Sequence, residues 1–262
     1  LFALCFFLAL VFVAIFATVL TPYPWNEINI DDAYMTPCLA HPFGCDELGR
    51  DILSRLMYGS RYSLALGIGA TAFSAVFGIF MGAMVGYYGG TIDNILMRIL
   101  DVFQAMPGTL FAIVISAVLG KGVDKTILAL GISGIPGMAR LMRASMLNVR
   151  EQEFVEASAS INCSNSRIIW KHVFPNSMQP MIVQVCGNVS MQILAATGLS
   201  YIGLGVQPPN PEWGAMLTAG RNYLRSYPHL VIMPGIVIML SVLAFNTMGD
   251  ALRDALDPKL KS

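Results

Sequence analysis

Charged side chains are scarce in this sequence. Of its 262 residues, only 12% are Asp, Glu, Lys or Arg, whereas 55% are hydrophobic. An ordinary soluble domain carries about 25% charged residues, so this chain has too little polar surface to cover its apolar content in water. The composition indicates that a lipid bilayer surrounds much of the chain. A formal net charge of zero argues against a nucleic-acid partner bound by bulk electrostatics.

Sequence motifs of catalysis are also absent. The chain contains no Walker A sequence and no Ser/His/Asp or metalloprotease pattern. Residues 67–72 resemble a dinucleotide fingerprint only loosely, because they lie in an apolar run with no preceding strand and no following acid. We therefore predict a non-enzymatic chain with no catalytic, cofactor-binding or metal-binding residues of its own.

Long stretches without a charged side chain are the main structural signal. Because about 20 apolar residues cross a bilayer as a helix, we predict one all-α transmembrane domain over residues 1–262. Its six spans lie near residues 1–21, 60–88, 93–119, 124–147, 178–205 and 229–251. Pro107 is expected to interrupt the third span. The first run lacks the basic flank of a signal peptide, so we interpret it as a span whose cytoplasmic lead-in is missing from this sequence.

Two longer loops join these spans, at residues 22–59 and 148–177. In the first, residues 46–61 have the pattern of an amphipathic helix, which we expect to lie along the outer interface. The second loop contains a short amphipathic segment. Its residues Phe154, Ala157, Ser158 and Ile161 follow the spacing of one helix face, and Glu153 suits the first turn.

An amphipathic helix outside the bilayer needs something to cover its apolar face. One alternative is lipid, but interfacial helices are usually rich in Lys and Arg, whereas this one carries Glu153 and Glu156. The other alternative is a soluble protein partner, which we favour. We expect Asn162 to end the helix in a left-handed turn, and a following helix to end at Pro175.

The same loop resembles the cytoplasmic coupling loop of ATP-binding cassette importers. That pattern reads Glu-Ala-Ala, three residues, Gly, and then a hydrophobic-Leu-Pro ending, and it matches here at residues 156–158 and 173–175. Asn162 stands where the family usually has Gly. The resemblance implies that this segment contacts a cytoplasmic ATPase through Glu153, Phe154, Val155, Glu156, Ala157, Ser158, Ile161 and Asn162.

Further stretches extend the resemblance over the whole chain. Residues 41–55 (HPFGCDELGRDILSR), 59–64, 199–209, 211–217 (PEWGAML) and 243–258 are similar to the second permease subunit of bacterial dipeptide, oligopeptide and nickel importers. The resemblance implies a type I importer fold in a bacterial inner (plasma) membrane. It also implies a homologous second permease as heterodimer partner, an extracytoplasmic solute-binding protein, and two cytoplasmic ATPases that bind ATP and Mg.

The cargo is less closely defined than the family. The resemblance favours short peptides, with nickel or a metal chelate as the alternative within the same class. An autonomous channel or ion-coupled carrier is the alternative from another class. Against it, no predicted span centre carries an obvious Asp, Glu, Lys or His relay.

Two sets of residues inside the spans suggest how the helices work together. Small residues recur every four positions in the second span, at Ser74, Gly78, Gly82 and Gly86. Such a stripe permits close helix approach, either as a static seam or as a sliding surface. In the fifth span, three amides follow the same spacing, at Gln184, Asn188 and Gln192. They either line a substrate pathway or join helices by hydrogen bonds.

The sequence leaves a few polar side chains with open roles. Cys38 and Cys45 in the outer loop either form a disulfide, as an oxidising compartment would allow, or remain free thiols. With His41 they offer at most three local ligands for a metal. Asp101, near the inner end of the third span, is expected to form an ion pair, with Arg98 as the nearest candidate.

Overall fold

Helices make up almost all regular structure in residues 2–256, the part of the chain that the computed structural model describes. The long helices are α1 (Phe2–Leu20), α2 (Ile52–Tyr88), α3 (Gly90–Gln104), α4 (Gly108–Leu119), α5 (Val123–Arg150), α9 (Gln179–Tyr201) and α11 (His229–Leu256). The short ones are η1 (Ile30–Asp32), α6 (Glu153–Ser160), α7 (Asn165–Arg167), η2 (Ile168–Val173), α8 (Phe174–Ser177), α10 (Trp213–Gly220) and η3 (Arg221–Tyr223).

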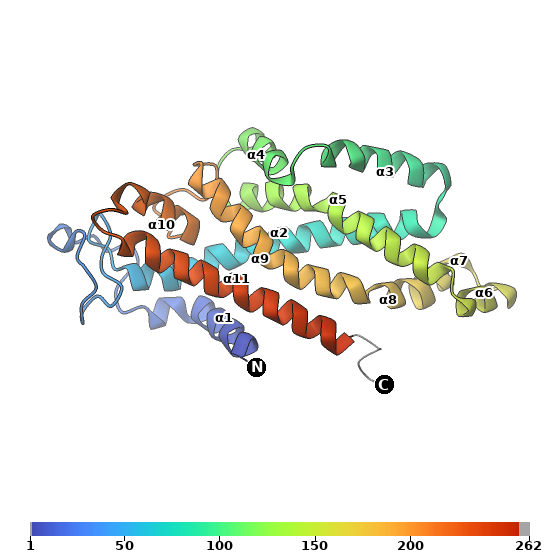
Figure 1. Ribbon diagram of the computed structural model, residues 1–262, viewed down its shortest axis with the longest axis horizontal. Coiled ribbons are helices and arrows are strands. Elements are labelled where there is room, and N and C mark those ends of the chain that lie inside the picture. Colours follow the sequence, from blue (N-terminus) through green and yellow to red (C-terminus); the bar gives the residue numbers. More distant parts are fainter. Residues whose placement is uncertain (1, 257–262) are drawn as a thin grey trace.

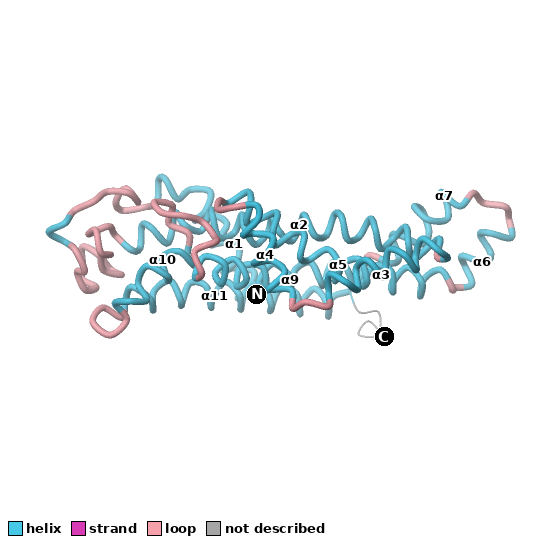
Figure 2. Tube along the Cα trace, turned by 90° about the horizontal axis from the view of Figure 1, so that it is seen from above, coloured by secondary structure: helices cyan, strands magenta, loops and turns pink. Residues whose placement is uncertain are grey.

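The molecule is elongated, and its long helices other than α4 run roughly along the long axis (Figure 1). Helices α2, α5 and α9 pack together, α11 packs on α9, and α1 lies against α2 and α11. Helix α3 lies along α5, and α4 contacts α5 near its start. Residues 21–51 and α10 occupy one end of the molecule, whereas α6 and α7 occupy the other (Figures 1 and 2). The two loops of the sequence therefore lie at opposite ends of one bundle.

Three helices, α2, α9 and α11, are each long and apolar enough to cross a membrane. Helices α3 and α4 together meet the same test, but they are bent by 86° relative to each other. The break falls at Pro107, which cannot donate a backbone hydrogen bond and disfavours a helical conformation in the residue before it. The all-helical expectation is confirmed, and the number of six spans stays a prediction.

The beginning of α2 differs from the prediction. The helix starts at Ile52, so residues 46–61 do not form a separate interfacial helix. The cause is a cap, since the Asp51 side chain accepts a hydrogen bond of 2.7 Å from the Ser54 backbone N–H. An aspartate cap satisfies a free N–H of the first turn, and α2 then continues without a break for 37 residues.

Close backbone approach joins α2 to α5. A side chain at Gly82 would overlap the carbonyl oxygen of Ala139, and one at Gly86 would lie 2.8 Å from the carbonyl oxygen of Arg143. A side chain at Gly78 would lie 2.5 Å from the Cβ atom of Met138. Ser74 lies beside Gly134 at the same contact. The small-residue stripe therefore forms a packed seam within this chain.

Two ion pairs connect α3 to α5. Arg143 binds Asp93 through two nitrogens, with Nε 2.6 Å from Oδ1. Arg140 donates to Asp101. The predicted pairing of Asp101 with Arg98 is therefore wrong, because the bundle brings an arginine of another helix to this carboxylate.

A buried carboxylate joins three helices at the outer-loop end. Glu212 is only 1% exposed. It accepts hydrogen bonds of 2.8 Å from the backbone of Gly214 and Ala215, so that it caps α10. It also accepts from the hydroxyls of Ser200 in α9 and Ser63 in α2. Burial raises the pKa of Glu212, and these four hydrogen bonds oppose that shift.

We expect Gly82→Leu to destabilise the bundle, because the new side chain must displace the α5 backbone. Overpacking of this kind costs about 1–3 kcal/mol, and Gly82→Ala should give a smaller loss. The measurement is thermal unfolding of the purified protein in mild detergent. Gly137→Ala is the matched control, since its added carbon meets no atom of another helix within 4 Å. Equal unfolding temperatures for Gly82→Leu and wild type would contradict the seam.

We also expect Glu212 to make stability depend on pH. Its folded-state pKa is raised, so ionisation is harder in the folded than in the unfolded protein. Stability should be unaffected below the unfolded pKa of about 4.3 and should fall as pH rises above it, until the folded pKa is passed. Glu212→Gln loses backbone hydrogen bonds at every pH but should remove this slope. Unfolding curves from pH 4 upward measure it, and parallel slopes for both proteins would refute the prediction.

Candidate functional site

The end of α2 holds the segment around α6 in place. The Arg150 side chain, at the end of α5, donates a hydrogen bond to the Tyr87 carbonyl and lies over the Tyr87 ring. The Tyr87 hydroxyl donates a bond of 3.5 Å to Asn165, which begins α7. One tyrosine therefore contacts the residues on both sides of α6. Sequence alone does not indicate this role, because Tyr87 lies inside an apolar run whose pattern predicts only a span.

Helix α6 turns one side chain inward and leaves its other apolar side chains uncovered. Val155 is 7% exposed and packs in a cluster with Met146, Ile168, Ile169 and Val173. Phe154 is 42% and Ile161 77% exposed. The face predicted from Phe154, Ala157, Ser158 and Ile161 is thus open to a partner, except that Ser158 is half-buried. Val155, grouped with the contact residues in the prediction, instead anchors the helix to the bundle.

The end of α6 is fixed by a left-handed residue. Asn162 adopts φ +59°, the conformation that its place after the helix suggested. The backbone N–H of Cys163 donates to the Ser158 carbonyl at 3.2 Å, and that of Asn162 donates to Ala159 at 2.9 Å. This pair of bonds is the Schellman motif, and asparagine is one of the few side chains other than glycine that adopt the backbone it needs.

The open face of α6 is acidic. Glu151, Glu153 and Glu156 are exposed, and none of them forms an ion pair with the residues that the structure describes. Glu156 also lines a hollow of about 330 Å³ together with Arg150, Gln152 and Tyr87. This end of the molecule therefore offers negative charge beside exposed apolar side chains.

Beyond Asn162 the chain differs from the expected helix that ends at Pro175. Ser164 takes the capping position of α7 without a side-chain hydrogen bond. The chain then continues through the wide turns of η2, a π-helix, into α8, where Pro175 occupies the first turn. Local π turns can accommodate a proline that lacks an N–H donor, which explains why Pro175 does not stop the chain from coiling.

The three amides of α9 have different surroundings. Gln184 is exposed, and its Nε2 donates to Oδ1 of the half-buried Asn188 at 2.9 Å. Gln192 is only 9% exposed, and it lies close to Gly134 at the contact of α9 with α5. Gln184 and Asn188 thus lie on an open face, whereas Gln192 is part of the packed interior.

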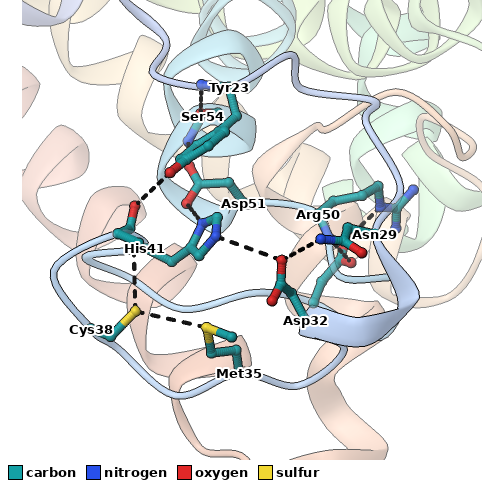
Figure 3. A network of polar contacts seen from close by, with 11 residues as sticks. Tyr23, Asn29, Asp32, Met35, Cys38, His41, Arg50, Asp51 and Ser54 are labelled. Carbon is teal, nitrogen blue, oxygen red and sulfur yellow. Dashed lines mark hydrogen bonds and ion pairs between the residues drawn. The ribbon is translucent and has the colours of Figure 1, made fainter.

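The outer loop is organised around a histidine and an aspartate (Figure 3). His41 Nδ1 lies 2.9 Å from Asp51 Oδ1, and its ring stacks on Tyr23 with centroids 4.7 Å apart. The backbone N–H of Tyr23 donates to the Ser54 hydroxyl. The aspartate that begins α2 therefore also holds the loop. The sequence pattern suggested His41 only as a metal ligand, because its pairing with Asp51 depends on how the loop folds.

The two outer-loop cysteines are free thiols in the structure, so a disulfide between them is not formed. Cys45 is fully buried, whereas Cys38 is exposed and accepts a hydrogen bond from the His41 backbone. Burial raises the pKa of Cys45 to about 12. Cys45 is thus an inert core residue, and spacing in the sequence could not reveal its burial.

Comparisons with known proteins agree with this architecture. The family model for the binding-protein-dependent transport system inner membrane component matches residues 74–262. A dipeptide transport system permease protein of Alkalihalophilus pseudofirmus is 43% identical over 96% of this chain and 83% of its own length. A glutathione transport system permease protein of Pectobacterium atrosepticum is 43% identical over 98% of this chain and 86% of its own length.

Solved structures share the fold at lower identity. A chain of the methionine ABC transporter MetNI in an inward-facing conformation superposes with a TM-score of 0.66 and 14% identity, covering 79% of this chain and 98% of its own. An amino acid ABC transporter chain gives a TM-score of 0.63 at 14% identity. These structures confirm the predicted importer-permease fold. Since the family model and the near full-length relatives agree, the chain belongs to the family of binding-protein-dependent transport system inner membrane components.

Proposed function

We propose that this chain is one permease subunit of an ATP-driven importer of short peptides in the bacterial plasma membrane. It forms half of the translocation pathway, next to a homologous second permease. Two cytoplasmic ATPases bind ATP and Mg, and one of them docks on α6 of this chain, while an extracytoplasmic solute-binding protein delivers the cargo to the opposite end. The relatives named for dipeptide and glutathione transport support peptides as the cargo, because glutathione is itself a short peptide.

The observation that carries this proposal is the construction of the α6 end. Val155 and the contacts of Arg150 with Tyr87 fix the helix on the bundle, whereas Phe154, Ile161 and the carboxylate of Glu156 remain open. A rigid helix with an uncovered apolar and acidic face suits a soluble partner that pushes on it. The same face would have no use in an autonomous channel or carrier.

The path of the cargo is the second part of the proposal. Gln184 and Asn188 lie on the open face of α9, where they can exchange hydrogen bonds with peptide groups. Gln192 is buried beside Gly134 of α5, so we assign it to helix packing rather than to the pathway. The pathway would then run between this face and the second permease.

Charge reversal at Glu156 tests the docking of the ATPase. We expect Glu156→Arg to weaken ATPase attachment on the order of tenfold, because it replaces an exposed acid in the contact face by a base. The measurement is the amount of ATPase that co-purifies with the tagged permease in mild detergent, together with peptide uptake. Asp254→Arg is the matched control, since it makes the same charge change at an exposed site on α11. Normal ATPase recovery and uptake in Glu156→Arg would count against docking on α6.

Removal of the α9 amides tests the pathway. We expect the double variant Gln184→Leu and Asn188→Leu to lower peptide uptake on the order of tenfold, because about two hydrogen bonds to the cargo are lost. ATPase recovery should stay normal. Met191→Leu changes an exposed apolar residue of α9 and should leave uptake unaltered. Uptake at the wild-type rate in the double variant would exclude these amides from the pathway.

A further inference from the structure

A small hollow lies at the outer-loop end of the molecule, between the start of α2 and helix α10. It has a volume of about 140 Å³, and its apolar wall includes Ile52, Met216 and Leu230. Pockets for drug-sized ligands enclose roughly 300–1,000 Å³, whereas a cavity of about 150 Å³ admits a molecule the size of benzene. The hollow therefore has room for one amino-acid side chain and is too small for a whole peptide.

Two arginines line this hollow and share a single carboxylate. Arg50 Nε lies 2.7 Å and Arg55 Nε 3.4 Å from the same oxygen of Asp46. The other oxygen of Asp46 accepts from the backbone N–H groups of Leu48 and Arg50, so this carboxylate has no capacity left. Glu47 also lines the hollow but forms no ion pair with either arginine in the described part of the chain.

The guanidinium groups retain donors that need an acceptor. Each guanidinium has five N–H donors. Besides Asp46, the described residues supply Arg55 with the Trp25 carbonyl alone, at 3.2 Å, and supply Arg50 with no further acceptor. Arg55 is only 5% exposed, and it lines the hollow. An acid entering the hollow would meet guanidinium donors that have no acceptor among the described residues, and charge-assisted hydrogen bonds to such donors are strong.

We propose that this hollow receives the side chain of a glutamate from the extracytoplasmic solute-binding protein. The two methylene groups of glutamate would lie on the apolar wall, and its carboxylate would bind Arg50 and Arg55. The hollow is lined by residues of α10 and of the start of α2, and α10 lies at the end of the molecule opposite α6 (Figure 1). The binding protein must dock at this end if the ATPase docks on α6. This inference rests on the proposed function, to which it adds the contact that recognises the binding protein.

Two variants of this chain remove the contact in different ways. Arg50→Gln takes away one positive charge, and Ala219→Leu places a larger side chain at the exposed edge of the hollow without changing charge. Ala219→Ser is the matched control, because it adds only one oxygen. The importer is assembled with both permeases and both ATPases in lipid nanodiscs. The Kd of its binding protein is then measured, with basal ATP hydrolysis and thermal unfolding recorded for each variant.

We expect Arg50→Gln and Ala219→Leu each to raise this Kd tenfold or more at the basal hydrolysis of wild type, and Ala219→Ser to leave the Kd unaltered. Ala219→Leu should keep the unfolding temperature of wild type, whereas Arg50→Gln should lower it, because it breaks the ion pair with Asp46. Arg50→Glu should lose affinity for the binding protein and regain it with one Glu→Lys variant of the binding protein, which identifies the inserted side chain.

A wild-type Kd for Ala219→Leu would overturn the proposal, even if Arg50→Gln proved unstable. If no ATPase assembled with the wild-type chain, the proposed function itself would fail. An active wild-type importer with insensitive variants would refute this inference alone.

Discussion

The close approach of α2 and α5 is the contact on which the rest of the structure depends. Because Gly78 and Gly82 carry no side chains, the backbones of the two helices meet directly, and neither helix can turn about its axis without a clash. Helix α2 has 37 residues and is therefore about 55 Å long. It begins at the Asp51 cap in the outer loop and ends beside Tyr87, which contacts the residues flanking α6. One helix thus connects the two ends of the molecule.

Charge is distributed so that this bundle stays apolar along its length. Where ionised groups occur between helices they have partners, as in the pair of Asp93 with Arg143. The buried Glu212 has four hydrogen-bond donors instead of a counter-ion. An unpaired charge in such surroundings would be costly, whereas at the two ends of the molecule charges can remain open to partners. The exposed acids of α6 are of this second kind, whereas the arginines of the outer hollow share the carboxylate of Asp46.

Residue spacing and backbone preference over short stretches predict much of this structure. Contacts between residues far apart in the sequence could not be predicted from them. The position of α6 and the left-handed turn at Asn162 follow from spacing and backbone preference over ten residues. The break at Pro107 follows from one residue. The partner of Asp101 could not be found in this way, because Arg140 comes from another helix. The burial of Cys45 could not be predicted from local signals either, because the spacing between Cys38 and Cys45 does not indicate which of the two thiols the loop encloses.

The three amides of α9 show how packing refines a pattern that the sequence displays as one stripe. Successive residues turn by about 100° around a helix, so a step of four residues drifts by about 40°. Gln192 is therefore rotated by about 80° from Gln184, which carries it into the contact with α5. The amides left on the open face lie in the half of α9 that follows α8. Because α7, η2 and α8 lead from the α6 segment into α9 with little interruption, a force applied at α6 would reach this polar face through the helical backbone itself.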